Sequence, residues 1–255
     1  MRVASVEIVE DRTPESRCDE GFLKISRLIL RNRHEDGSLS EAYPCDIVSR
    51  PGSDAVVAVL YEIGPDRKVR VLLREGLRAP IYLRRLRKFV HPDARTYTAI
   101  HELVAGLLEK KDGEGEDALR NRAAAESAEE AGLEIEAGRF AILGGETFAS
   151  PGTSDEKLFY AAAAVRLDDA GDAPGDGSVM EQAARLVRME LGEAIALCRQ
   201  GMIPDMKTEI GLLRLADHLD YLPQLGCFAT DLPEEIRRRY RRRGIEPRPG
   251  AGEGR

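Results

Sequence analysis

Two apolar runs constrain the fold of this chain more than any other feature. They are DAVVAVLY (Asp54–Tyr61) and KVRVLLR (Lys68–Arg74), and the turn signal Gly64-Pro-Asp66 separates them. Short apolar runs that are rich in β-branched residues and bounded by turn residues are typical of strands buried in a core. We therefore predict that these runs are neighbouring core strands of one sheet.

A different pattern precedes these runs. Residues 22–50 alternate apolar and polar side chains, and the turn signal His34-Glu-Asp-Gly-Ser38 interrupts the alternation. Such alternation is typical of antiparallel strands with one covered face. We predict that residues 1–52 form an N-terminal β subdomain, separate from the sheet that holds the apolar runs.

Strand and helix patterns follow one another irregularly in the rest of the chain. We predict strands at Ala99–Gly106, Phe140–Thr147, Leu158–Val165 and Arg185–Glu190, and helices at Asp117–Ala131, Gly192–Gln200 and Thr208–Asp220. Loops are expected at Ala149–Lys157 and Asp168–Ser178. Because no regular βαβ alternation is present, an α+β sandwich is favoured over a doubly wound sheet.

Composition excludes several classes of protein. The 255 residues are 42% hydrophobic and 33% charged, which is ordinary for a globular protein, and the net charge of −7 argues against a broad nucleic-acid surface. Neither a long apolar run nor a secretory signal is visible, so we expect a cytoplasmic protein with no membrane partner. The four cysteines, Cys18, Cys45, Cys198 and Cys227, lie far apart and are interpreted as free thiols.

Two basic clusters interrupt the acidic composition. One is LRRLRK at Leu83–Lys88, and the other is RRRYRRR at Arg237–Arg243, which follows a helix start at Asp231. We interpret the second cluster as a solvated helix or as a contact for a polyanion. Residues 223–255 are predicted to hold this helix and a disordered tail at Glu246–Arg255, which is rich in Pro, Gly and Arg.

The predicted helix at Asp117–Ala131 carries the strongest chemical signal. Its segment Ala125-Glu-Ser-Ala-Glu-Glu-Ala-Gly-Leu133 places Glu129 and Glu130 each within about 60° of Glu126 around the helix axis. Like charges at this spacing destabilise a helix unless something neutralises them. Taken alone, the pattern fits either a solvated acidic face or a site for Mg²⁺, which prefers carboxylate and carbonyl oxygens.

The segment, together with Glu102-Leu-Val-Ala-Gly106 before it, resembles the Nudix box, G-x5-E-x7-R-E-U-x-E-E-x-G-U, in which U is aliphatic. The resemblance implies that Glu126 and Glu130 are the principal metal ligands, with Glu129 as an auxiliary catalytic carboxylate. It also implies a further ligand, the backbone carbonyl of Ala105. Magnesium is the expected ion, with Mn²⁺ as the alternative.

The chain departs from this motif at three points. Ala125 stands where the family has Arg, and Ser127 stands where it has an aliphatic residue. The spacing from Gly106 to Glu126 is also five residues longer than the motif allows. We therefore expect Asp117, or Glu116 beside it, to serve as the first acidic residue of the box.

Further segments resemble the ADP-ribose pyrophosphatase branch of the Nudix family. They are ELVAGLLE from Glu102, Ser150-Pro-Gly with Glu156 after it, Ile203-Pro-Asp-Met-Lys-Thr208, and Arg50-Pro-Gly-Ser-Asp-Ala-Val-Val. The resemblance implies a Nudix-type α/β/α sandwich over residues 53–222. It also implies a catalytic base or metal-assisting role for Glu156, a phosphate contact for Arg78, and substrate contacts at Arg50, Glu102 and Pro151.

The expected activity is Mg²⁺-dependent hydrolysis of the pyrophosphate bond of a nucleoside diphosphate sugar. ADP-ribose is the first candidate, and it would give AMP and ribose 5-phosphate. UDP-glucose and GDP-mannose remain alternatives, as does a Nudix-fold nucleotide-binding or regulatory module in which Ala125 has cost the activity. Structural interpretations also remain open: Pro151 in a tight turn, Glu156 as an exposed acid and Arg78 as a surface cation.

Two expectations concern the arrangement of the chain and its helix. The N-terminal strands are too few to form an independent core, and the resembling branch forms intertwined homodimers, so we expect a homodimer. Arg122 lies four residues before Glu126 and about 40° away around the helix. It is therefore either an exposed ion-pair partner or a replacement for the arginine missing at Ala125.

Overall fold

The computed structural model describes residues 3–11, 22–171 and 184–241. An eight-stranded mixed sheet forms its centre. The main path of this sheet runs in the order β11 (Arg185–Glu190), β5 (Val69–Gly76), β4 (Ala55–Ile63), β10 (Lys157–Ala164) and β8 (Ala141–Ile142). Of these strands, β4 and β10 are parallel, whereas β4 and β5 form an antiparallel hairpin around Gly64. The two predicted core strands are therefore confirmed.

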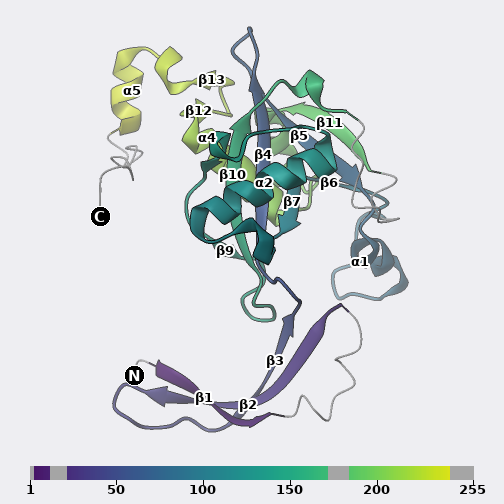
Figure 1. Cartoon of the computed structure of the whole chain (residues 1–255), viewed down its shortest axis with the longest axis vertical. Coiled ribbons are helices and arrows are strands. Elements are labelled where there is room, and N and C mark those ends of the chain that lie inside the picture. The colour runs from purple at the N-terminus through teal and green to yellow at the C-terminus, as the bar shows by residue number, and fades with distance from the viewer. Residues whose placement is uncertain (1–2, 12–21, 172–183, 242–255) are drawn as a thin grey trace.

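Helices cover both faces of this sheet, which explains the continuous apolar run in β4. Val57 and Val59 pack toward α3 (Leu191–Arg199) and α4 (Met206–His218). Val56 and Ala58 pack on the opposite face, toward α2 (Gly115–Ala131). Figure 1 shows α2 lying across its face of the sheet. Because successive strand side chains point to opposite faces, a strand between two helix layers must be apolar at every position.

The predicted strand at Ala99–Gly106 is two strands in the structure. β6 (Ile100–Glu102) pairs with β5, and β7 (Val104–Leu107) pairs with β4. The break lies at Leu103, whose backbone N–H donates to Thr208 Oγ at 2.9 Å instead of to a neighbouring strand. The chain therefore changes partner strand at this point, which a periodicity argument does not detect.

A similar correction applies to Phe140–Thr147. Only β8 (Ala141–Ile142) and β9 (Thr147–Phe148) are extended there, and both pair with β10. The turn between them contains Gly144, whose φ of 77° favours glycine. Arg214 of α4 donates to the Leu143 carbonyl at 2.9 Å, so the turn is held from the helix layer.

The N-terminal strands form a separate antiparallel sheet. It consists of β1 (Val3–Asp11), β2 (Lys24–His34) and β3 (Tyr43–Ser49), in that order. The strands within residues 22–50 confirm the prediction, whereas β1 was not predicted. Figure 1 shows this sheet standing apart from the main body. Leu30 is the one residue of this sheet classed as buried among those whose side chains the structure describes.

Short elements complete the described chain. They are α1 (Ala79–Tyr82), η2 (Leu83–Leu86), η3 (Lys110–Asp112), η4 (Ala137–Arg139), η5 (Leu167–Asp169), β12 (Tyr221–Leu222), β13 (Cys227–Phe228), η6 (Ala229–Asp231) and α5 (Glu234–Arg241). The last of these confirms a helix at the start of the second basic cluster.

Several sequence predictions fall partly or wholly outside the described residues. Cys18, the predicted tail at Glu246–Arg255, and most of the predicted loop at Asp168–Ser178 belong to this group. Cys45, Cys198 and Cys227 are free thiols, as predicted. Among the described residues, no helix is both long enough and apolar enough to span a membrane.

Candidate active site

The acidic face of α2 opens into a pocket of about 390 Å³. Glu126, Glu129 and Glu130 all line this pocket, together with Ala105 and Gly106 of β7. The helix ends where the sequence predicted, because Gly132 takes a left-handed conformation with φ 66° and its N–H donates to the Ala128 carbonyl. The helical spacing thus brings the three predicted carboxylates to one cavity.

Gly106 brings β7 and α2 into close contact at the floor of the pocket. A Cβ atom at this position would overlap the carboxyl group of Glu126. The absence of a side chain at Gly106 leaves the space in which the Glu126 carboxyl group lies directly against the strand. Its position agrees with its predicted place as the first glycine of the motif.

Arg122 is a buried part of the site and not an exposed ion-pair partner. It is 2% exposed, and its guanidinium binds Asp112 through two hydrogen bonds of 3.0 Å. A further nitrogen lies 3.3 Å from Glu126 Oε1, and another ion pair reaches Glu109 at 2.8 Å. Burial would lower the pKa of Arg122, but the bound carboxylates raise it, so the group is charged. This geometry fits the interpretation in which Arg122 orients Glu126.

The buried partner of Arg122 corrects one sequence expectation. Asp117 and Glu116, expected as the first acidic residue of the motif, are largely exposed and pair with Arg120. Asp112 is the buried acid instead, and its carboxylate also accepts from the Glu109 backbone N–H at 2.7 Å. The sixth residue after Gly106 is Asp112, so the surplus residues lie after this position, where Gly113 and Gly115 both adopt positive φ.

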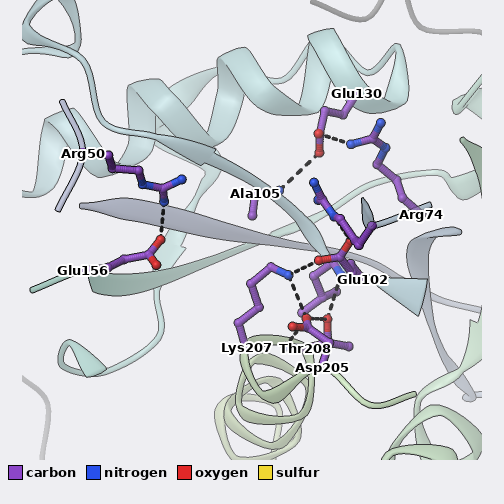
Figure 2. A network of polar contacts seen from close by, with 11 residues as sticks. Arg50, Arg74, Glu102, Ala105, Glu130, Glu156, Asp205, Lys207 and Thr208 are labelled. Carbon is purple, nitrogen blue, oxygen red and sulfur yellow. Dashed lines mark hydrogen bonds and ion pairs between the residues drawn. The ribbon is translucent and has the colours of Figure 1, made fainter. Parts of the chain in front are cut away.

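Glu130, which also lines the pocket, is held by a basic side chain of the sheet. Arg74 of β5 donates to Glu130, and the Ala105 backbone N–H lies 3.3 Å from the other carboxylate oxygen. The side chains of Arg74 and Glu130 are only 12% and 7% exposed. Figure 2 shows Glu130 between these two donors.

Glu102 lies at the centre of a second charged cluster in the same pocket. It accepts from Arg78 at 2.5 Å and from Lys207 of α4. Lys207 also binds Asp205 at 2.9 Å, and Asp205 caps α4 by accepting from the Thr208 N–H and hydroxyl (Figure 2). Burial would raise the pKa of Glu102, but the two cations outweigh burial and lower it. Burial likewise opposes the charge of Lys207, yet the carboxylates raise its pKa.

The remaining predicted residues lie at the edge of the pocket or beyond it. Arg50 lines the pocket and forms an ion pair with Glu156, as Figure 2 shows, but Glu156 itself is not among the lining residues. Pro151 lies exposed in a turn closed by Thr153 N–H on the Ser150 carbonyl at 2.9 Å. For Pro151 the structure therefore shows the tight-turn interpretation and no contact with the pocket.

Three residues of the site had no predicted role. Arg74, Lys207 and Asp112 each make an ion pair with a predicted or neighbouring site residue. Lys207 lies inside the matched segment Ile203–Thr208, so its position carried a signal. Arg74 and Asp112 were not distinguishable from ordinary strand and loop charges.

The donor chemistry of the pocket fits a hard divalent cation. Three carboxylates and the carbonyl group of Ala105 offer only oxygen ligands. In the arrangement observed, however, no three acidic, His or Cys side chains of the described residues converge closely enough to hold an ion. The carboxylate of Glu126 faces Arg122, and that of Glu130 faces Arg74. Metal binding would therefore require rearrangement of these side chains.

Comparison with known proteins supports the fold and leaves the family open. No family model matches the sequence, and no curated protein does. A solved structure described as an "ADP compounds hydrolase" matches 86% of this chain and 93% of its own chain, with a TM-score of 0.53 and 16% identity. This similarity shows a Nudix-like α+β fold, as the sequence predicted.

Proposed function

We propose that this protein is a Mg²⁺-dependent hydrolase of the pyrophosphate bond in a nucleoside diphosphate sugar, with ADP-ribose as the first substrate to test. The observation that carries the proposal is the pocket itself, which is lined both by Glu126, Glu129 and Glu130 and by the cations Arg74 and Arg78. A binding site for a diphosphate uses both types of charge. Cationic side chains bind the phosphate oxygens, and carboxylates hold the metal ion that the phosphates share. The similar fold of an ADP compounds hydrolase supports the same class of substrate.

Each residue has a distinct task in this proposal. Glu126 and Glu130 hold Mg²⁺ with the Ala105 carbonyl, and Glu129 assists them. When bound, the metal neutralises phosphoryl charge and lowers the pKa of a bound water. Arg78 contacts a phosphate, and Arg122 positions Glu126 through its hydrogen bonds at the helix.

Glu156 is proposed as the base that deprotonates or orients the attacking water. Its ion pair with Arg50, which lines the pocket, is the contact that supports this role. Glu156→Gln should then lower kcat with little change in KM, because the group acts on the water and not on binding. An increase in KM alone would assign Glu156 to substrate binding.

A panel of nucleotide sugars with Mg²⁺ or Mn²⁺ tests the activity directly. We expect release of AMP from ADP-ribose, and loss of turnover by orders of magnitude in Glu130→Gln. The fold of this variant should survive, because Gln keeps a carbonyl oxygen that can accept from Arg74 or from the Ala105 N–H. Undiminished turnover in Glu130→Gln would exclude the α2 face as the metal site, and UMP or GMP release instead of AMP would redirect the substrate assignment.

A nucleotide-binding module without catalysis is the second candidate. Two observations favour it: Ala125 in place of the motif arginine, and the carboxylates of Glu126 and Glu130 facing arginines. In that case ADP-ribose would bind without releasing AMP under any divalent cation. The same panel, measured once for binding and once for product, distinguishes the two candidates.

A further inference from the structure

The chain between β5 and β6 forms a basic, aromatic loop that the proposed hydrolysis does not use. Residues 79–97 contain five cations and a single acid, Asp93, in a protein of net charge −7. The loop lines a separate hollow of about 650 Å³. Its cations are Arg84, Arg85, Arg87, Lys88 and Arg95, and its aromatic residues are Tyr82, Phe89 and Tyr97.

One contact within the loop, one to α3 and one between its flanking residues define its arrangement. Arg84 binds Asp93 through two hydrogen bonds of 3.0 and 2.8 Å within the loop. Arg95 donates to the Gly201 carbonyl at 2.5 Å, which ties the loop to the end of α3. The ion pair of Arg78 with Glu102 joins the residues on either side of the loop at the candidate active site. These contacts shape the loop and join its two ends next to that site.

The loop presents cations that are available to a ligand. The side chains of Arg85, Arg87 and Lys88 are exposed and form no hydrogen bond or ion pair with any residue that the structure describes. Unpaired cations gathered on a protein of opposite net charge raise the local concentration of anions. An apolar ligand would gain nothing from them.

The rings of the loop add a second kind of recognition. The guanidinium of Arg85 lies 3.8 Å from the centre of the Tyr82 ring, and that of Arg84 lies 4.1 Å from the Phe89 ring. Arg95 lies 5.1 Å from the Tyr97 ring. Stacked arginine and aromatic planes present flat surfaces on which a nucleobase can stack, and the same guanidinium groups can bind a phosphate.

We propose that the loop at residues 79–97 is a binding site for a nucleoside phosphate. Arg85, Arg87 and Lys88 bind the phosphate groups, and the planes around Tyr82 and Tyr97 accept the base. The site lies beside the candidate active site and does not depend on hydrolysis there. It can therefore hold a nucleotide in the absence of metal.

Equilibrium dialysis of radiolabelled ADP against the full chain, in EDTA, tests this proposal. We expect the triple variant Arg85→Gln, Arg87→Gln, Lys88→Gln to bind ADP at least tenfold more weakly than wild type. The matched control replaces three exposed arginines outside the hollow with Gln: Arg166, Arg199 and Arg238. This control removes the same total charge and should leave ADP binding unchanged.

A second variant separates a nucleoside phosphate from a plain anion. Tyr82→Leu with Tyr97→Leu should weaken ADP binding at least fivefold, while inorganic pyrophosphate binds as to wild type. Equal ADP binding by wild type and the triple variant would overturn the proposal, as would a ring variant that binds ADP normally. Binding of phosphatidylserine vesicles with no binding of ADP would also overturn it. Because EDTA removes divalent metal, none of these outcomes depends on the proposed hydrolase activity.

Discussion

The buried guanidinium of Arg122 lies next to the carboxylate of Glu126, and this contact bears on the absence of the motif arginine at Ala125. Arg122 reaches Glu126 from one turn earlier in α2, and Asp112 fixes it with two hydrogen bonds. Two parallel donors fix the plane of a guanidinium, which a lysine cannot reproduce. Arg122 can therefore supply the orientation that an arginine at position 125 would give.

We expect Arg122→Lys to lower kcat tenfold or more, about 1.4 kcal/mol in the barrier. Lysine keeps a positive charge beside Asp112, whereas Arg122→Ala would leave a buried carboxylate unpaired and destabilise the fold by about 3–5 kcal/mol. Kinetics with ADP-ribose measure the effect. Ala125→Arg should raise activity more in the Arg122→Lys background than in wild type, and equal gains in both would show that the two positions do not share this task.

The ion pair between Arg74 and Glu130 leads to a prediction about the affinity of the pocket for a divalent cation. This ion pair competes with a divalent cation for the same carboxylate. We therefore expect Arg74→Gln to bind Mn²⁺ more tightly than wild type, by a few fold or more, in a titration followed by electron paramagnetic resonance. Arg70→Gln is the matched control, because Arg70 also lies in β5 but its side chain is more exposed than that of Arg74 and pairs with Asp66. Weaker Mn²⁺ binding by Arg74→Gln would mean that Arg74 supports the metal site.

At the scale of elements, one charged cluster links β6 to α4. Glu102 binds Lys207, and the N–H of Leu103 beside it binds Thr208 at 2.9 Å. The same link breaks the predicted strand and positions the pocket-lining carboxylate. The contacts of Glu102 and Leu103 with α4 therefore serve two purposes: they attach the helix to the sheet, and they set the position of Glu102 in the site.

This cluster predicts an acid-dependent loss of stability. The cations hold the pKa of Glu102 below its ordinary value of 4.5. The ionised carboxylate therefore contributes fully to the free energy of unfolding above pH 4.5, and this contribution is lost as the pH falls toward the lowered pKa. In calorimetry at pH 7, the Tm of the Glu102→Gln variant should be well below that of wild type. The difference between the two Tm values should become smaller below about pH 4.5. Replacement of the exposed Glu146 by Gln should leave Tm nearly unchanged throughout. A gap independent of pH would show that Glu102 stabilises by packing alone.

At the scale of the whole molecule, the separate N-terminal sheet raises the question of what covers it. Ile8 and Val9 of β1 are 61% and 47% exposed, and Phe22 and Leu23 before β2 are 60% and 52% exposed. A three-stranded sheet with so little buried surface gains little stability alone. A second copy of the chain would bury these side chains, which is the reason to retain the homodimer prediction.

Light scattering of the full chain should therefore give a dimer mass. Phe22→Asp with Leu23→Asp should shift the mass toward the monomer, because charges would be buried in the interface. Leu225→Asp changes a similarly exposed leucine, 57% exposed, in the turn between β12 and β13 and should leave the mass unchanged. A monomer mass for wild type would refute the prediction.

The β1 strand and the break at Leu103 show where sequence patterns stop being informative. β1 lacks a clean alternation, and its pairing with β2 shifts register between Val3 and Ser5 and between Ile8 and Glu10. The strand that pairs with it begins after residues 12–21, and pairing across such a segment leaves no local signal. The strand break at Leu103 depends on a hydroxyl of α4 far along the chain. Periodicity reports the environment of one segment and does not report its partner.

The sequence by itself determined the core strand β4, the end of α2 at Gly132 and the shared face of Glu126, Glu129 and Glu130. Each of these follows from local rules: burial on two faces, a left-handed glycine, and helical spacing. Only the tertiary structure decided which cations meet those carboxylates. Lys207 reaches Glu102 across 105 residues, and Arg74 reaches Glu130 across 56. Burial makes such pairs strong enough to shape the site, and burial is a property of the folded molecule.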